Sequence, residues 1–388
     1  MPKRTILIIL IIALLLCSCQ SGTKDNSDTD FDALLKKSTD IDFGDTTYNI
    51  ETDSQNYFEM QMRAITASPD GYFLFKWYPK AEILCFIDKN TKKCIPVCSR
   101  ADCHHNDDSC DAAYHGLNYI NYYNGSLYAV GAQTDINNPP YAYFYLYRIS
   151  CDSSVYEKVF DMVYVDGNNT IVPQFIMHRG CVYYIIKNGE EYFLYLYDID
   201  KKSKQLLYYV KDPYAVLGVM QGYGDGIFFT VCPGENEKDK LIYYNRKNGE
   251  YYEIIEKMSS ASYTIINDGI LYYDGKYIKK VEFTTLDETD FIECERVYVS
   301  YDGRYVYTDN EWNCTYDQEH LDYSNRRVEV YGVDGKHIDT INLAGNTGFP
   351  IFGDKDYMFF YFNDDNISML DKSQIGTGKH EWVEVKED

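Results

Sequence analysis

The chain has 388 residues, of which 45% are hydrophobic and 16% aromatic, including 41 tyrosines. Abundant aromatic residues supply a large core, which excludes disorder for most of the chain. Lysine and arginine number 37 against 60 aspartates and glutamates, giving a net charge of −23. We therefore expect no nucleic-acid partner, because a phosphate backbone binds a basic face.

The N-terminus is predicted to be an export signal. Lys3 and Arg4 precede an unbroken apolar run over residues 6–16. A membrane-spanning helix needs about 20 such residues, so this run is too short and is typical of a secretory signal peptide. We assign residues 1–18 to that signal peptide.

The signal ends in a motif that resembles the bacterial lipobox. In that motif a leucine lies three residues before, and a small residue one before, a cysteine that is lipidated. Leu16, Ser18 and Cys19 occupy these positions, while Cys17 departs from the usual alanine or serine. The resemblance implies a lipoprotein anchored through Cys19 on the extracytoplasmic face of the cell membrane. An ordinary cleaved secretory signal is the alternative.

Two regions follow the signal. Residues 19–45 are rich in serine, threonine and aspartate and show little apolar periodicity. We predict that they form a lipidated, flexible acidic tether. Residues 46–388 are predicted to form a single folded domain.

This domain contains a repeated unit. A turn dipeptide is followed each time by a strand of alternating aromatic and aliphatic residues. The seven dipeptides are Asp70-Gly71, Asn124-Gly125, Arg179-Gly180, Asp225-Gly226, Asp268-Gly269, Asp302-Gly303 and Lys355-Asp356. Asp-Gly and Asn-Gly suit tight hairpins because both residues tolerate positive φ. A short strand before each turn and a hairpin after the second strand make four strands per unit.

Four antiparallel strands repeated about every fifty residues indicate an all-β fold, the β-propeller. One four-stranded sheet cannot bury both of its faces, whereas radial stacking covers each blade with its neighbours. Seven blades are favoured, with six or eight as alternatives.

Two units carry a sequence that points to known propellers. Residues 305–309 read Tyr-Val-Tyr-Thr-Asp, and residues 270–274 read Ile-Leu-Tyr-Tyr-Asp. They resemble the Tyr-Trp-Thr-Asp tetrad of low-density-lipoprotein-receptor-related propellers, without its tryptophan. More broadly, the domain is similar to bacterial extracytoplasmic propellers of this kind and of the TolB-like kind. The resemblance implies a mostly non-catalytic domain that binds proteins or glycans.

A cysteine- and histidine-rich insertion at residues 94–110 does not belong to the repeat. Cys98, Cys103, His105 and Cys110 have the spacing C-x4-C-x-H-x4-C. Zn²⁺ favours four sulfur and nitrogen ligands in a tetrahedron, and four protein ligands leave no open position for water. The spacing therefore predicts a structural zinc site.

Disulfides are the alternative at this insertion. Small loops of exported proteins are commonly cross-linked by cystines, and the neighbouring cysteines could pair as Cys98–Cys103 or Cys103–Cys110. Free thiols are the third interpretation, and the sequence leaves all three open.

No catalytic motif is present, and we assign no catalytic residue. His178, at the end of an inner strand, is the strongest of several weak candidates. The sequence favours a surface-anchored, non-catalytic propeller that binds a protein or glycan. The alternative is a carbohydrate-active lyase or hydrolase on the same scaffold. A flat aromatic surface would favour binding, and a deep pocket with converging histidine, arginine, tyrosine or paired carboxylates would favour the enzyme.

Cys19→Ala tests the anchor. Two or three acyl chains hold a protein on a membrane far more firmly than one, because each buried CH₂ contributes about 0.8 kcal/mol. We expect the variant, or globomycin treatment of the wild type, to move the protein from the membrane to the soluble fraction. Unchanged fractionation on immunoblots would contradict the lipoprotein interpretation.

Overall fold

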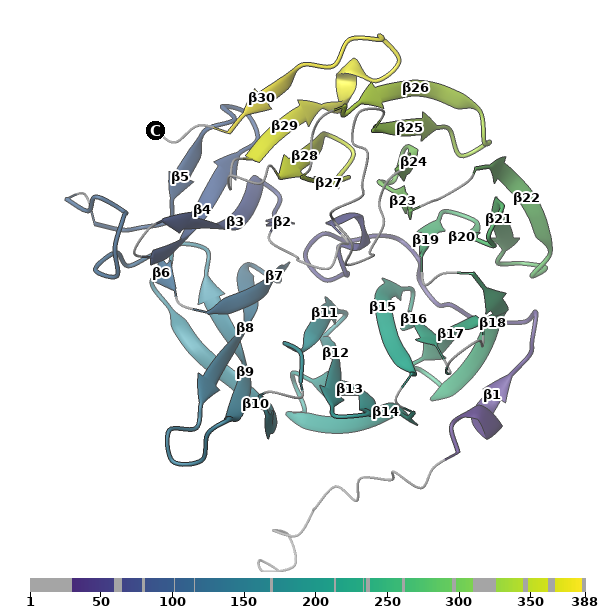
Figure 1. Cartoon of the computed structure of the whole chain (residues 1–388), viewed down its shortest axis with the longest axis horizontal. Coiled ribbons are helices and arrows are strands. Elements are labelled where there is room, and N and C mark those ends of the chain that lie inside the picture. The colour runs from purple at the N-terminus through teal and green to yellow at the C-terminus, as the bar shows by residue number, and fades with distance from the viewer. Residues whose placement is uncertain are drawn as a thin grey trace, which may run out of the picture.

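The chain forms a ring of seven antiparallel sheets, as Figure 1 shows. The computed structural model describes residues 30–58, 65–78, 81–100, 102–114, 116–167, 170–212, 214–232, 234, 238–259, 262–294, 298–309, 326–344, 348–361 and 367–385. The expected signal peptide and Cys19 lie outside the described residues. Within this part of the chain, the helical segments are short 3₁₀ turns, and none has the length and apolar character needed to span a bilayer.

Each blade is built from four consecutive strands, with the first strand nearest the centre of the ring. Blade 1 contains β2 (Ile65–Ala67), β3 (Gly71–Tyr78), β4 (Ala81–Asp88) and β5 (Cys94–Pro96). Blade 2 contains β7 (Leu117–Tyr123), β8 (Ser126–Thr134), β9 (Tyr141–Ser150) and β10 (Tyr156–Asp166). Blade 3 contains β11 (Gln174–His178), β12 (Cys181–Asn188), β13 (Glu191–Asp198) and β14 (Ser203–Lys211). Blade 4 contains β15 (Val216–Tyr223), β16 (Gly226–Cys232), β17 (Asp239–Asn245) and β18 (Glu250–Met258).

The remaining three blades follow the same pattern. Blade 5 contains β19 (Tyr263–Ile266), β20 (Gly269–Tyr273), β21 (Tyr277–Glu282) and β22 (Glu288–Glu293). Blade 6 contains β23 (Tyr298–Tyr301), β24 (Val306–Asp309), β25 (Arg327–Tyr331) and β26 (His337–Asn342). Blade 7 contains β27 (Phe349–Ile351), β28 (Tyr357–Tyr361), β29 (Ile367–Asp371) and β30 (Trp382–Glu384). The predicted all-β propeller of seven blades is confirmed.

The predicted turns set this pattern. All seven dipeptides lie at the connection between the first and second strands of a blade. Asn124 and Gly125 have φ angles of 47° and 72°, and Arg179 and Gly180 have 46° and 82°. These are the left-handed conformations that tight two-residue hairpins require. The second strands are buried on both faces, as in β12, because each lies between two neighbouring blades.

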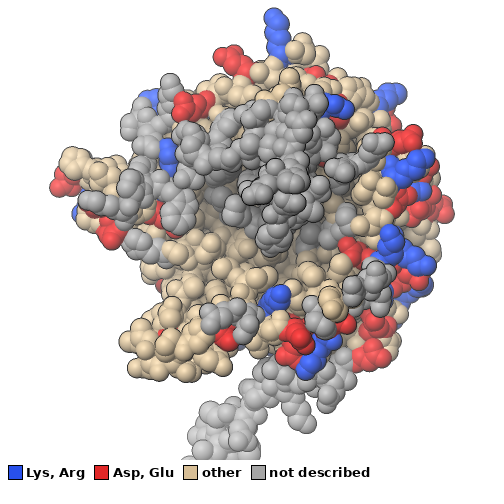
Figure 2. All heavy atoms as spheres, viewed as in Figure 1, with Lys and Arg blue, Asp and Glu red and all other residues tan. Residues whose placement is uncertain are grey.

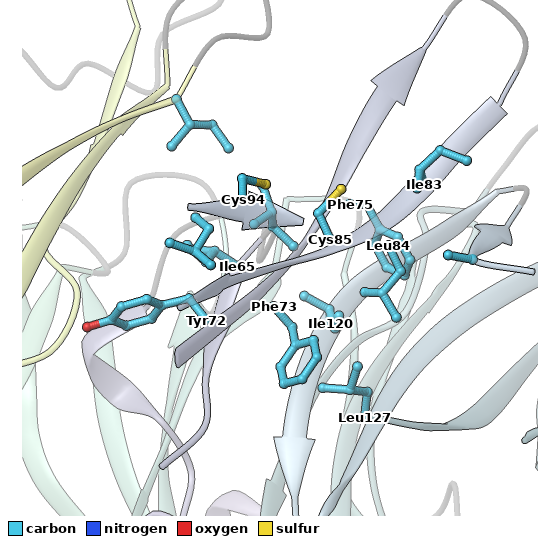
Figure 3. Close-up of a cluster of buried hydrophobic side chains, with 14 of the residues drawn as sticks. Ile65, Tyr72, Phe73, Phe75, Ile83, Leu84, Cys85, Cys94, Ile120 and Leu127 are labelled. Carbon is cyan, nitrogen blue, oxygen red and sulfur yellow. The ribbon is translucent and has the colours of Figure 1, made fainter. Parts of the chain in front are cut away.

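The ring closes by packing between blades 1 and 7, because each of these blades is made from its own stretch of chain. One apolar cluster joins blade 1 to residues of blade 2, including Ile120 and Leu127, as Figure 3 shows. The same cluster reaches Phe359 of blade 7, whose ring lies 4.8 Å from the ring of Tyr72. The Tyr72 hydroxyl donates to the Asp354 carboxylate at 2.8 Å. Closure therefore combines apolar burial with a directed hydrogen bond.

The start of the described chain packs along the edge of blade 4. After the 3₁₀ turn η1 (Asp32–Leu34), β1 (Leu35–Lys36) pairs in parallel with β18 as a fifth strand. The buried Phe31 ring lies 5.1 Å from Tyr208 in blade 3 and 6.2 Å from Tyr251 in blade 4. This segment therefore spans the boundary between the two blades.

Residues 42–57, here called the central segment, continue from that edge to the middle of the ring (Figure 1). The Phe43 ring lies 4.9 Å from Tyr243 in blade 4 and 4.8 Å from Phe283 in the turn of blade 5. The backbone N–H of Asn124 in blade 2 donates to the Glu51 carbonyl at 2.7 Å. The central segment thus contacts blades on opposite sides of the ring.

The flexible tether was predicted to extend to residue 45. In the structure, residues from Phe31 onward lie against blades 3, 4 and 5. The blades themselves begin only at Ile65, in β2. A few aromatic anchors hold this polar segment, and such isolated anchors do not produce a periodic sequence pattern.

Phe43→Ala tests the attachment of the central segment. We expect the free energy of unfolding to fall by about 2 kcal/mol, since this ring is half-buried and fully buried Phe→Ala changes cost about 3–5 kcal/mol. Urea unfolding followed by tyrosine fluorescence measures the change. Ile136→Ala is the control, because its side chain is 88% exposed and should change stability by less than about 0.5 kcal/mol. Equal stability of the two variants would show that the segment contributes nothing to the fold.

Candidate functional site

Residues 97–112 form a projecting segment at the perimeter of the ring, beside β5 and β6 in Figure 1. It follows the outermost strand of blade 1, where the sequence placed the insertion. The short strand β6 (Ala113–Tyr114) then returns to pair with β4, the strand that β5 also pairs with. Both ends of the segment are therefore fixed to the same strand.

The four predicted ligands converge in this segment. The ligand atoms of Cys98, Cys103, His105 and Cys110 all lie within 4.8 Å of one another. His105 Nδ1 lies 3.5 Å from Cys110 Sγ. In a zinc tetrahedron with bonds of about 2.3 Å, two sulfurs lie about 3.8 Å apart, so small movements bring these atoms to ligand positions.

Local turns orient the ligands. His105 has a φ angle of 51°, a left-handed conformation, and its N–H donates to Cys103 Sγ at 3.4 Å. Arg100 also donates to Cys103 Sγ, from Nη2 at 3.3 Å. A zinc ion with three thiolates and a neutral imidazole carries a net negative charge, and this guanidinium lies beside it.

The thiols differ in acidity. Burial raises the pKa of Cys110 to about 12, so it stays protonated unless a cation is present. At Cys98, burial is opposed by hydrogen bonds from the backbone N–H groups of Arg100 and Asp111, and these lower the pKa of its thiol. A divalent cation would favour the thiolate at both positions.

The composition of the cluster favours a metal site over a disulfide. A disulfide joins two sulfurs, whereas three sulfurs and one imidazole nitrogen converge here. Cys94 takes no part, because it is buried in β5 and points into the core with Cys85, as Figure 3 shows. The arrangement can hold one tetrahedral cation with S₃N coordination.

His178, the strongest catalytic candidate of the sequence, is buried at the end of β11. Its Nδ1 accepts from the N–H of Ser54 at 3.2 Å, and its Nε2 lies 2.9 Å from the carbonyl of Gly224. Burial lowers its pKa to about 4, so the ring is neutral at pH 7. The adjacent Arg179 is paired with Asp53 at 3.0 Å. Both side chains therefore hold the central segment in place.

A row of tyrosines, which the sequence analysis did not identify, crosses the outer part of blade 2. Four of its members alternate along β9, and the row, here called the tyrosine strip, comprises Tyr114, Tyr141, Tyr143, Tyr145, Tyr147, Tyr156 and Tyr164. Neighbouring rings have centroids 4.3 to 6.0 Å apart all the way along it. Tyrosine at every second position of 141–147 was the available signal, since alternate residues of a strand share one face.

The strip is partly open to solvent, with Tyr114 and Tyr145 buried at 6% and 8% exposure. Tyr141, Tyr156 and Tyr164 are 37%, 49% and 40% exposed. The hydroxyl of Tyr164 donates to Asp135 at 2.9 Å and accepts from the Asn138 side chain at 3.1 Å. Figure 2 shows few charged side chains over the blade 2 hairpin, at the lower left of the visible face. The strip combines apolar ring faces with hydrogen-bonding groups along its edge.

Comparison with known proteins shows the fold alone. No protein-family model and no curated protein matches the chain. Solved structures match at low identity. A prolyl endopeptidase is 12% identical with a TM-score of 0.51, the match covering 85% of this chain and 50% of the other, so the chain spans about half its length. A putative 6-phosphogluconolactonase from Bacteroides fragilis is 11% identical with a TM-score of 0.48, covering 83% and 97%. TolB from Acinetobacter baumannii is 13% identical with a TM-score of 0.40, covering 69% and 62%.

Metal analysis of the purified protein tests the cysteine cluster. We expect about one equivalent of zinc to remain after dialysis, because four protein ligands enclose the ion. Cys103→Ser and His105→Asn should each lower the retained zinc severalfold in plasma mass spectrometry. Cys151→Ser is the matched control, since this half-buried cysteine lies outside the cluster. Mass-mapped Cys98–Cys103 or Cys103–Cys110 bridges in protein prepared without reductant would contradict the metal site.

Proposed function

We propose that this protein is a non-catalytic propeller, anchored to the outer face of the cell membrane, that binds a linear glycan along the tyrosine strip. The strip is the observation that supports the proposal. It is about one ring wide, and β9 extends about 20 Å from Tyr141 to Tyr147 at the usual rise per residue. A stable protein interface buries about 800 Å² on each partner, which calls for a broader surface.

The chemistry of the strip fits a sugar chain. A sugar has an apolar C–H face that packs on aromatic rings, and hydroxyl groups that bond to the side chains around them. Asp135 and Asn138 lie at one end of the strip, and the Lys158 ammonium lies over the ring of Tyr145, 4.6 Å from its centroid. These groups supply acceptors and donors beside the rings.

The catalytic alternative requires converging groups near the middle of the ring. Among the residues that the structure describes there, His178 and Arg179 are engaged by the central segment. Because of these contacts, neither side chain is available as a catalytic base or nucleophile. This supports a binding function over a lyase or hydrolase. Release of unsaturated or hydrolysed products from pectin, xylan or dextran would favour the enzyme instead.

We also propose that Cys98, Cys103, His105 and Cys110 hold a structural zinc ion. The ion would fix the projecting segment at the end of the strip where Tyr114 lies. It would supply no chemistry to a ligand, because all four of its positions are taken by the protein.

Affinity electrophoresis tests the strip. In gels that contain xylan, dextran or polygalacturonate, we expect retardation of the wild type by at least one polysaccharide. Tyr141→Ala combined with Tyr164→Ala should weaken binding about tenfold or more, since truncated aromatic anchors dominate binding energies. Tyr214→Ala is the control, a 61% exposed tyrosine outside the strip.

Two results would contradict the proposal. One is equal retardation of the strip variant and the control. The other is no retardation of the wild type by any of the three gels while the protein still binds intact cells, which would point to a protein partner.

A further inference from the structure

A cavity of about 450 Å³ lies between blades 3 and 4, on the side of the ring that carries the predicted turns. This volume falls within the range of small-molecule sites, about 300–1,000 Å³. Its walls come from the ends of β13, β14 and β17 and from the β15–β16 turn, and Leu196 and Tyr244 supply buried apolar surface. The cavity is separate from both the tyrosine strip and the cysteine cluster.

Arg246 is the distinctive group in this cavity. Its Nη1 donates to the buried thiol of Cys181 at 2.9 Å. Burial raises the pKa of that thiol, so the sulfur does not neutralise the guanidinium. Among the described residues, no carboxylate lies within ion-pairing distance of Arg246. An arginine offers a planar fork of five N–H donors, and the exposed side chain of Arg246 lines the cavity with only its Nη1 donor engaged by Cys181.

The other charges of the cavity are already paired. Lys201 contacts Asp198 at 2.8 Å, and Lys247 contacts Asp42 at 3.4 Å. Asp225 is paired with an arginine of blade 3 at 3.3 Å. The cavity is therefore lined by three basic and two acidic side chains, which leaves one positive charge at Arg246. This local excess is opposite in sign to the net charge of the chain, −23.

This balance specifies the charge of a ligand. A monoanion neutralises Arg246, whereas a phosphate dianion would also face the carboxylates of Asp198 and Asp225. A carboxylate matches the guanidinium fork with two parallel hydrogen bonds. The two aspartates can then accept hydrogen bonds from hydroxyl groups, and Ser203 and Gln205 can both donate and accept them.

We propose that this cavity binds a small sugar acid, with its carboxylate on Arg246 and its hydroxyls on the surrounding polar side chains. The site binds without covalent chemistry. The sugar-acid site shares no residue with the tyrosine strip, so an experiment can contradict one proposal without affecting the other.

Isothermal titration calorimetry of the purified protein tests the site with D-glucuronate, D-glucose and inorganic phosphate as probes. We expect glucuronate to bind at one site and glucose to give no heat. Arg246→Gln should weaken glucuronate binding roughly ten- to hundredfold, the range for losing charge-assisted hydrogen bonds. Lys201→Gln should weaken it roughly two- to fivefold through lost attraction, and its 78% exposed side chain poses no risk to folding.

Arg327→Gln is the matched control, because this half-exposed arginine lies on β25 of blade 6, outside the cavity, and should leave the affinity unchanged. The proposal is overturned if the wild type does not bind glucuronate, or if Arg246→Gln binds it as tightly as the control. Tighter binding of phosphate than of glucuronate would also overturn it, and would identify a phosphate site instead.

Discussion

The fold depends on covering both faces of every four-stranded sheet. A blade between two neighbours is covered automatically, but blades 1 and 7 meet only if the ring closes. Many residues at that junction are buried, including Phe359 and Met369 of blade 7 against Ile65 of blade 1. The Asp354 carboxylate accepts from the Tyr72 hydroxyl and pairs with Lys89 at 3.0 Å. These polar contacts fix the relative position of two blades that share no strand.

A buried ion pair has a comparable role between blades 6 and 7. Lys372 and Asp302 are both fully buried, and the Lys372 ammonium also donates to the Asp354 carbonyl at 2.5 Å. Taking two charges out of water offsets much of their attraction, so such a pair contributes little net stability. Removing one partner would leave an uncompensated buried charge. The main effect of the Lys372–Asp302 ion pair is therefore to fix the position of blade 7 relative to blade 6, next to the junction that closes the ring.

The sequence predicted the features that local chemistry determines. Turn dipeptides such as Asn124-Gly125 identified all seven blades, and at two of the seven both residues have the positive φ angles of a tight hairpin. The spacing within residues 98–110 identified four side chains that do converge. The attachment of residues 31–57 was not predictable, since single anchors such as Phe43 give no periodicity. Nor was the cavity at Arg246, because the groups that line it come from separate blades.

The central segment lies in the middle of the ring, so a ligand has less access to the inner strands there. The central segment occupies the groups around His178, so the two surfaces proposed for recognition lie elsewhere, at the perimeter and in the cavity between blades 3 and 4. At the perimeter, Tyr114 connects two of the features. It belongs to β6, directly after the cysteine cluster, and its ring lies 5.3 Å from Tyr156 of blade 2. Residues 97–112 contain few apolar residues besides their cysteines, so a metal ion would add order that apolar packing alone supplies only in part. The cluster would then affect ligand binding indirectly, by holding Tyr114 at the blade 1 end of the strip. The other tyrosines of the strip lie on β9 and β10.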